Sequence, residues 1–168
     1  LKVRDIYPES ALLESSDFHG NENSLSFIAL CPLASIGINN GESTAVFPDG
    51  IREVTPLAEN YNVADAMNAF LSRYSIVCGL FGYTAFDAVR YFENIPVMEA
   101  HHEENDAPDM LYILYKYILV FNHFKNELTL VELLQENEQS NLQEIEALIE
   151  NRNYASYNFQ TSGPETSP

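Results

Sequence analysis

The side chains of this chain that could bind a metal ion or move a proton are scattered along it. The segment HHEEND at residues 101–106 offers two histidines, two glutamates and an aspartate as potential metal ligands. Neighbouring residues of a loop seldom converge on one ion unless the fold arranges it, so this acidic segment is more typical of a surface loop. His19 and His123 have no visible partner for acid–base work. No nucleophile elbow or glycine-rich phosphate loop occurs, so the motifs build no complete active site.

The segment ALLESS at residues 11–16 has two interpretations that its residue types leave open. In the first, the two leucines join a core while Glu14 and the serines meet solvent or cap a turn. In the second, Glu14 neutralises an α-ammonium group and the Ser15 hydroxyl helps to fix a zwitterion beside apolar walls. Both require a strand around residues 11–15 that delivers the carboxylate to the surface.

The segment GLFGYTAFDAVRYFE at residues 79–93 predicts a strand followed by a short helix that opens at Thr84. Gly79 and Gly82 lack side chains, which favours close packing against another backbone or ring. On the helix, Asp87 and Arg90 lie three residues apart and are expected to form an ion pair. The residues expected to face inward are Phe86, Val89 and Phe92.

The remaining elements predict an α+β fold, with a largely antiparallel β-sheet and helices packed on it. Asn-Gly in INNGES indicates a tight hairpin, and Asn62 is a plausible helix N-cap. The helix near 137–151 places Leu142, Ile145, Leu148 and Ile149 on one side. Helices are expected at 63–74, 85–93 and 137–151. Strands are expected at 25–38 (one strand or a strand pair, bent at Pro32), 43–47, 51–57, 75–83 and 110–134, the last broken by a turn near 122–127.

The charge balance argues against nucleic acid as a partner. The 168 residues carry 25 acidic and 8 basic side chains, a formal net charge of -17 that repels phosphate backbones. Hydrophobic residues make up 46% of the chain, enough for one globular core. No stretch approaches the ~18 apolar residues of a membrane span and no leader is visible, so we expect a cytoplasmic protein without a membrane partner. Cys31 and Cys78 sit in apolar settings and are expected to be reduced core residues.

Three segments, in order, resemble the N-terminal region of anthranilate synthase component I. They are LLESSD at 12–17, GLFGYTAFDAVRYFE at 79–93, and PDM at 108–110 followed by LVFNHFKNELTL at 119–130. The final FQTSGPETSP is similar to the stretch that leads into the chorismate-binding domain of that enzyme. The resemblance therefore covers almost the whole chain and implies the fold of that N-terminal region.

The resemblance also implies a division of labour within a larger enzyme. Anthranilate synthase component I converts chorismate to anthranilate and pyruvate in tryptophan biosynthesis. It uses ammonia from a glutamine amidotransferase subunit, and a magnesium ion at an active site in the chorismate-binding domain. Residues 1–157 would be the N-terminal regulatory region and 158–168 a linker toward that domain. This chain is expected to hold no catalytic or metal-binding residue, to need no cofactor and to lack synthase activity by itself.

By the same resemblance the LLES segment lines the pocket for tryptophan, the feedback inhibitor. The implied tryptophan-binding residues are Leu13, Glu14, Ser15 and Ser16, with Glu14 and Ser15 holding the amino acid. Some relatives carry a basic residue in the loop after LLES that helps to hold the inhibitor, and the equivalent position here is Leu25. The expected partners are tryptophan, the chorismate-binding domain of the same chain and the amidotransferase subunit.

Two other interpretations remain open. Aminodeoxychorismate synthase component I, a sister enzyme of folate biosynthesis, shares the GLFGY and PDM features. Glu14 favours the tryptophan enzyme because the sister enzymes often vary at that place. A free-standing, non-enzymatic amino-acid-binding domain is the third interpretation, and it predicts tryptophan binding by the isolated chain.

Overall fold

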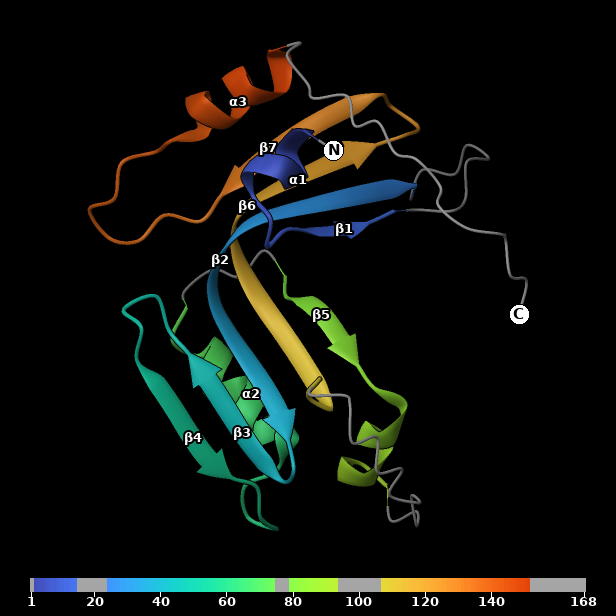
Figure 1. The fold of residues 1–168 in the computed structure, drawn as a ribbon, viewed down its shortest axis with the longest axis vertical. Helices are drawn as coiled ribbons and strands as arrows, with labels where there is room; N and C mark the ends of the chain where they lie inside the picture. Colours follow the sequence, from blue (N-terminus) through green and yellow to red (C-terminus); the bar gives the residue numbers. More distant parts are fainter. Residues whose placement is uncertain (1, 15–23, 75–78, 94–106, 152–168) are drawn as a thin grey trace, which may run out of the picture.

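The structure is a computed structural model that describes residues 2–14, 24–74, 79–93 and 107–151. Seven strands of these residues form one antiparallel sheet, with helices packed on it, which confirms the predicted α+β class (Figure 1). The strands are β1 (Ala11–Leu13), β2 (Leu25–Asn39), β3 (Glu42–Val46), β4 (Arg52–Pro56), β5 (Phe81–Thr84), β6 (Met110–Asn122) and β7 (Glu127–Glu132). The helices are α1 (Lys2–Ile6), α2 (Val63–Leu71), the 3-10 helix η1 (Phe86–Tyr91) and α3 (Leu142–Glu150).

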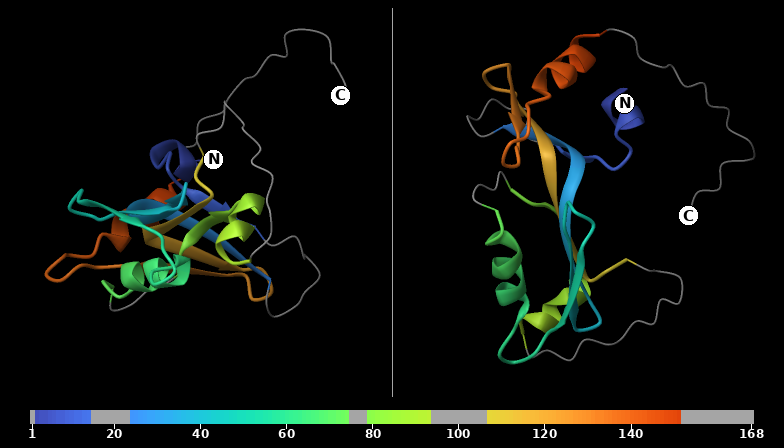
Figure 2. Two further views of the ribbon diagram at one scale, coloured as in Figure 1. Left: turned by 90° about the horizontal axis from the view of Figure 1, so that it is seen from below. Right: turned by 90° about the vertical axis from the view of Figure 1, so that its left-hand side faces the viewer.

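Two long strands, β2 and β6, pair along almost their whole length and divide the sheet into halves. In the upper half of Figure 1, β1 pairs with β2 and β7 pairs with β6. In the lower half, β3 and β4 extend the sheet beside β2, and β5 pairs with β6. Helix α2 lies on one side of the sheet and α1 on the other (Figure 2). Each half therefore has its own helical cover.

Strand β2 is one continuous strand that bends, as the proline in its middle predicts. The register against β6 shifts between Pro32 and Ala34, and Cys31 adopts a φ of 58°. A proline cannot donate to the ladder, so an extra residue and a bend are accommodated there as a β-bulge. The Asn40-Gly41 turn that follows has φ values of 49° and 75°, as a tight hairpin requires.

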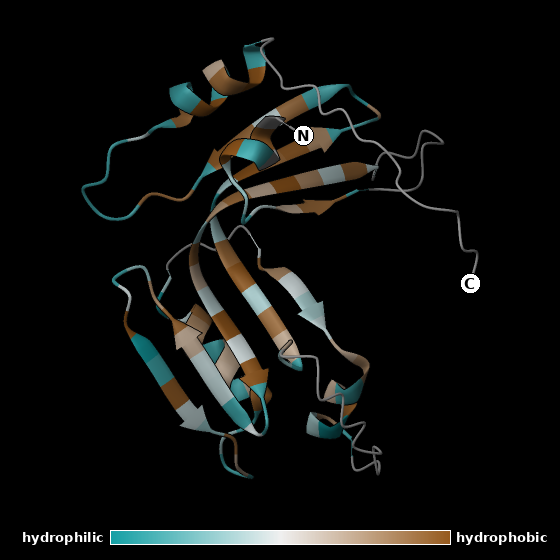
Figure 3. Cartoon of the chain, in the orientation of Figure 1, coloured by the Kyte–Doolittle hydropathy of each residue, from teal (hydrophilic) through white to brown (hydrophobic). Residues whose placement is uncertain are grey.

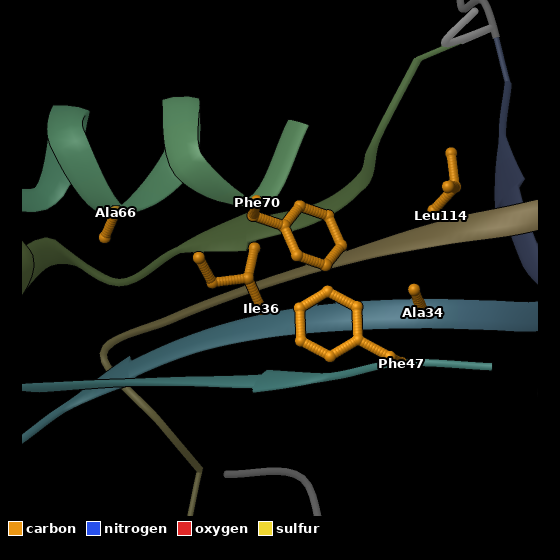
Figure 4. Close-up of a cluster of buried hydrophobic side chains, with 6 residues drawn as sticks. All are labelled: Ala34, Ile36, Phe47, Ala66, Phe70 and Leu114. Atoms are coloured by element: carbon orange, nitrogen blue, oxygen red, sulfur yellow. The ribbon is translucent and has the colours of Figure 1, made fainter. Parts of the chain in front are cut away.

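Helix α2 covers the lower half and begins as predicted. The Asn62 side chain accepts a hydrogen bond from the backbone N–H of Asp65 at 3.1 Å, and the Asp65 carboxylate accepts one from the Asn62 N–H at 2.9 Å. This reciprocal pair is a capping box. The helix ends at Leu71, before the predicted residue 74. Its apolar side packs on β2, β3 and β6 to form a core of Ala34, Ile36, Phe47, Ala66, Phe70 and Leu114 (Figure 4).

Helices α1 and α3 cover the upper half, where Ile145 is the fully buried residue of α3. Helix α3 begins at Leu142, five residues later than 137, because the preceding residues bond to the sheet instead. The Ser140 hydroxyl donates to the Glu132 carboxylate at 2.6 Å, and Glu138 pairs with Lys116 of β6. The buried residues of this cluster are Leu30, Tyr117, Leu119 and Ile145, with Leu142, Ile149 and the half-buried free thiol of Cys31 packed against them.

The short helix after β5 has the predicted spacing but the opposite orientation. It is a 3-10 helix, in which residues three apart lie above one another. Phe86 and Phe92 are 89% and 57% exposed, so the expectation that they face inward is wrong. Ala88 and Tyr91, also three apart, pack against Ile38 and Met110. Thr84 belongs to β5 and not to the helix.

The predicted Asp87–Arg90 ion pair does not form. Arg90 instead places Nη2 2.6 Å from Oδ2 of Asp109, which also accepts a hydrogen bond from the Tyr91 hydroxyl at 2.6 Å. The Asp109 side chain is only 13% exposed, and a largely buried carboxylate requires a cation and hydrogen-bond donors. The Gly41 N–H donates to the Tyr91 hydroxyl at 3.1 Å, so this cluster ties η1 to the β2–β3 hairpin.

The two glycines of the GLFG segment have different roles. A Cβ on Gly82 would lie 1.8 Å from the carbonyl oxygen of Leu111, so only glycine fits, and the predicted close packing is confirmed. Gly79 has open space around its Cβ position and a φ of +120°, so its role is conformational. Cys78, the HHEEND segment, His19 and the predicted linker at 158–168 lie outside the described residues. None of the described helices is long and apolar enough to cross a membrane.

Candidate functional site

The ALL segment forms a short strand, β1, whose leucines are exposed. Leu12 and Leu13 are 62% and 50% exposed, although the segment is among the most hydrophobic parts of the upper half (Figure 3). The interpretation that both leucines join the core is therefore wrong. Ala11 is the residue of β1 that packs against the buried cluster of Ala29, Phe81, Tyr115 and Ile118.

Strand pairing places the two leucines on opposite faces of the sheet. Leu13 stands opposite Phe27, which stands opposite Val120 of β6. Leu12 belongs to the next row, with Ile28 and Leu119. Successive side chains of a strand alternate between faces. Because Ile28 and Leu119 pack with α3, Leu12 lies on the helix-covered face and Leu13 on the other.

Leu13 thus ends an apolar row that no described helix covers. Phe27 and Val120 are half-buried and pack against Ala29 and Ile118, which lie on the same face two residues along each strand. Beyond Leu13 the row has no further strand among the described residues, since β1 pairs with β2 only. The row offers an apolar surface on which a ring could pack. The sequence alone could not predict it, because Phe27 and Val120 are 93 residues apart and are brought together by the pairing of β2 with β6.

Glu14 follows directly after β1 and is exposed. It makes no ion pair or hydrogen bond with the part of the chain that the structure describes. Glu14 lies beyond the end of β1, beside this row and not in it. A carboxylate there can accept charge-assisted hydrogen bonds from an ammonium group while the row takes the apolar part. Of the four predicted site residues, Leu13 and Glu14 are therefore adjacent and accessible. Ser15 and Ser16 lie outside the described residues.

A polar pair that the sequence did not reveal lies at the same end of the sheet. The Ser26 hydroxyl is 2.7 Å from Nε2 of His123, and the His123 ring packs on Phe121 with centroids 4.7 Å apart. Ser26 precedes Phe27, the partner of Leu13, on β2, so the pair lies near the end of β1. His123 looked isolated in the sequence because its partner is 97 residues away. Leu25, the position of the expected basic residue, belongs to β2 rather than to a loop.

An ionic cluster fixes the other side of the upper half. Lys116 pairs with Glu138 and lies 4.0 Å from Glu132, whose side chain is only 3% exposed. Burial would raise the pKa of Glu132, but hydrogen bonds from Ser140, Asn141 and Tyr117, together with Lys116, lower it overall. The hydrogen bond to Glu138 raises the pKa of Lys116. The cluster joins β6, β7 and the approach to α3, so it holds these three elements together.

Within the described ranges, no three histidine, cysteine, aspartate or glutamate side chains gather in a group that could hold a metal ion. The magnesium ion implied by the resemblance stays a prediction about the complete enzyme.

Comparison with known proteins identifies the family. Residues 9–167 match the family model described as chorismate binding enzyme. The chain belongs to the chorismate-binding enzyme family. It is 30% identical over 135 residues to anthranilate synthase component 1 of Thermus thermophilus, an alignment that covers 78% of this chain and 28% of that protein.

A solved structure is also similar to this chorismate-binding family member. The crystal structure of anthranilate synthase component I from Streptococcus pneumoniae TIGR4 aligns at a TM-score of 0.49 and 21% identity, and covers 82% of this chain and 29% of that one. The chain thus spans less than a third of the length of either relative. The resemblance seen in the LLESSD, GLFGY and PDM segments is supported by the family match and the sequence relative.

Proposed function

We propose that this chain is the tryptophan-binding, feedback-inhibition portion of an anthranilate synthase component I. The complete enzyme would convert chorismate and ammonia or glutamine to anthranilate and pyruvate, with magnesium at its active site and a glutamine amidotransferase as partner. The family membership and the 30% identity to the Thermus enzyme support this assignment. The 168 residues alone are proposed to have no synthase activity.

The observation that carries the proposal is the exposed apolar row that ends at Leu13 and is followed at once by the carboxylate of Glu14. An indole would lie against Leu13, Phe27 and Val120, and the α-ammonium group would approach Glu14. Ser15 and Ser16 would complete the contacts to the amino acid. The 50% exposure of Leu13 has a physical reason in this arrangement, because the ligand and the chorismate-binding domain would cover it.

Calorimetric titration of the chain with L-tryptophan tests the binding step. L-Tryptophan is expected to bind, and indole-3-propionate, which lacks the ammonium group, is expected to bind at least about tenfold more weakly, since a charge-assisted hydrogen bond contributes about 1.5–3 kcal/mol. Equal affinity for the two ligands would contradict the role of Glu14.

Two pairs of variants locate the site. Glu14→Gln should weaken tryptophan binding about tenfold, while Glu59→Gln, an exposed glutamate of the lower half, should leave it unchanged. Leu13→Ala should weaken binding and Leu12→Ala should not, because the two leucines lie on opposite faces of β1. An equal loss in Leu12→Ala and Leu13→Ala would place the ligand elsewhere.

Product analysis of the complete enzyme separates the sister activities. Chorismate and ammonia should yield anthranilate, and formation of aminodeoxychorismate in its place would assign the chain to the folate enzyme. Anthranilate formation by the purified 168 residues would contradict their proposed inactivity. If the complete protein forms neither product while the chain binds tryptophan, the free-standing sensor is the correct interpretation.

A further inference from the structure

A large hollow, whose lining includes neither Leu13 nor Glu14, lies at the junction of the two halves. It has a volume of about 800 Å³ and sits between the residues after α2, the turn between β3 and β4, and the segment after β7. Figure 1 shows the β3–β4 turn facing the β7–α3 connection on the left-hand side of the molecule. The apolar residues that line it are Leu33, Pro48, Leu114, Val131, Leu133 and Leu134.

One polar group of this cavity has no partner within the described structure. Tyr74 lines the cavity, and its hydroxyl is buried without a hydrogen bond. Its ring packs against Phe70 with centroids 5.5 Å apart, which holds the hydroxyl oxygen in place. Burial raises the pKa of Tyr74, which keeps the phenol neutral and able to donate. A buried hydroxyl left unpaired costs about 1–3 kcal/mol, which a ligand with a matching polar group would recover.

The charges around the cavity favour a cation over an anion. The guanidinium of Arg73 is already neutralised, since Nη2 lies 2.7 Å from both carboxylate oxygens of Glu53 and the group stacks 4.1 Å above the Phe47 ring. Glu132 is likewise committed to Ser140, Asn141 and Lys116. Asp49 accepts one hydrogen bond from the Ile51 N–H.

The carboxylates of Asp49 and Glu136 therefore carry negative charge at the lining that no described cation pairs. A dicarboxylate such as chorismate would be repelled there, whereas an ammonium group would be attracted. The combination of an apolar wall, one neutral hydroxyl and two carboxylates is that of a site for a small amine with a ring and a hydroxyl or carbonyl group.

We infer that this cavity is a second ligand site, for a small aromatic amine, separate from the proposed tryptophan site. The ring packs against the leucines, an uncharged polar group bonds to the Tyr74 hydroxyl, and the ammonium group is directed to Asp49 and Glu136. This inference does not depend on the proposed function, because it uses neither β1 nor the chemistry of chorismate.

Three matched probes test it by NMR titration of the ¹⁵N-labelled chain of 168 residues. Tyramine is expected to bind, with shifts centred on Leu33, Tyr74 and Leu134. Phenethylamine, which lacks the hydroxyl, should bind about fivefold more weakly, and 3-(4-hydroxyphenyl)propanoate, which carries a carboxylate in place of the amine, about tenfold more weakly or not at all.

Variants then attribute the hydroxyl preference to Tyr74. Tyr74→Phe removes the unpaired hydroxyl without a change of shape, so it should fold at least as well as the parent and bind tyramine and phenethylamine equally. The control Tyr83→Phe, whose hydroxyl donates to the Pro108 carbonyl outside the cavity, should keep the fivefold preference. Leu134→Trp should block all three probes.

Equal affinity of the parent for tyramine and the carboxylate probe would overturn the inference, as would shifts that avoid Tyr74 and Leu134. A fivefold preference that persists in Tyr74→Phe would also overturn it. Glu14→Gln should leave tyramine binding unchanged, so failure here and failure of the proposed tryptophan site are distinguishable.

Discussion

The two halves of the sheet share β2 and β6 but differ in how completely they are covered. In the lower half, α2 closes over a core in which Phe70 is 2% and Leu114 is 0% exposed. In the upper half, α3 covers one face, but Leu12 and Leu13 of β1 are 62% and 50% exposed. The lower half thus has a closed core under α2, whereas the edge at β1 exposes the two leucines next to Glu14, which is where we propose that tryptophan binds.

The largest effect on the free energy of unfolding is expected for removal of a buried aromatic ring, compared with removal of an exposed one. Phe70→Ala should lower the free energy of unfolding by about 3–5 kcal/mol, because it removes a ring that stacks on Phe47 at 5.9 Å and leaves a cavity under α2. Phe86→Ala, at a ring that is 89% exposed, should change it by less than about 0.5 kcal/mol. Urea denaturation of both variants measures the difference, and similar losses would contradict the assignment of the core.

Two glycines, Gly82 of β5 and Gly37 of β2, lie next to the backbone of β6 from opposite sides, at different distances. Gly82→Ala should cost about 3 kcal/mol, since its Cβ would overlap the Leu111 carbonyl and the backbone of β5 would have to move. Gly37→Ala is the control, because its Cβ would meet the Met110 oxygen at an ordinary 3.6 Å. Thermal unfolding should show a lower midpoint for Gly82→Ala only. A stable Gly82→Ala would mean that β5 is not held against β6 as described.

The ionic cluster of the upper half predicts a dependence on acid. The folded-state pKa of Glu132 is lowered, so its contribution to stability is present above the ordinary glutamate pKa of about 4.5 and is lost as the pH falls through the folded value. Glu132→Gln should therefore be less stable than the parent at pH 7, with the gap narrowing as the pH falls below about 4.5. Urea denaturation across that range measures the gap, and a constant difference would exclude titration of Glu132 as its source.

A small effect is expected at β1. Leu13→Ala should change the free energy of unfolding by less than about 0.5–1 kcal/mol, although leucine-to-alanine changes in cores cost about 2–5 kcal/mol. Chemical denaturation of the chain without ligand measures it. A loss as large as that of Phe70→Ala would show that Leu13 belongs to a core, and the contrast between the halves would disappear.

Local signals made much of this fold predictable. The Asn40-Gly41 hairpin, the Asn62 cap and the proline bend of β2 each depend on residues close in sequence, and the structure has all three. The aromatic run from Met110 also gave β6, its turn and β7.

The predictions that were wrong concern contacts between distant residues. Spacing alone predicted a pair between Asp87 and Arg90. Arg90 pairs with Asp109 instead, because the carboxylate of Asp109 is largely buried and requires a cation. The same limit hid the Ser26–His123 pair and the wall that Phe27 and Val120 form beside Leu13, since strand register sets both. The inward side of η1 is likewise set by a contact between distant residues, because Ala88 packs against Ile38 and Met110.

The proposed role of Glu14 in feedback control is the central claim, and inhibition of the complete enzyme by tryptophan tests it most directly. Glu14→Gln should raise the tryptophan concentration for half-inhibition about tenfold, because the ammonium group loses its carboxylate, while kcat and KM for chorismate stay unchanged. Unaltered inhibition in Glu14→Gln, with the variant folded and active, would contradict the account.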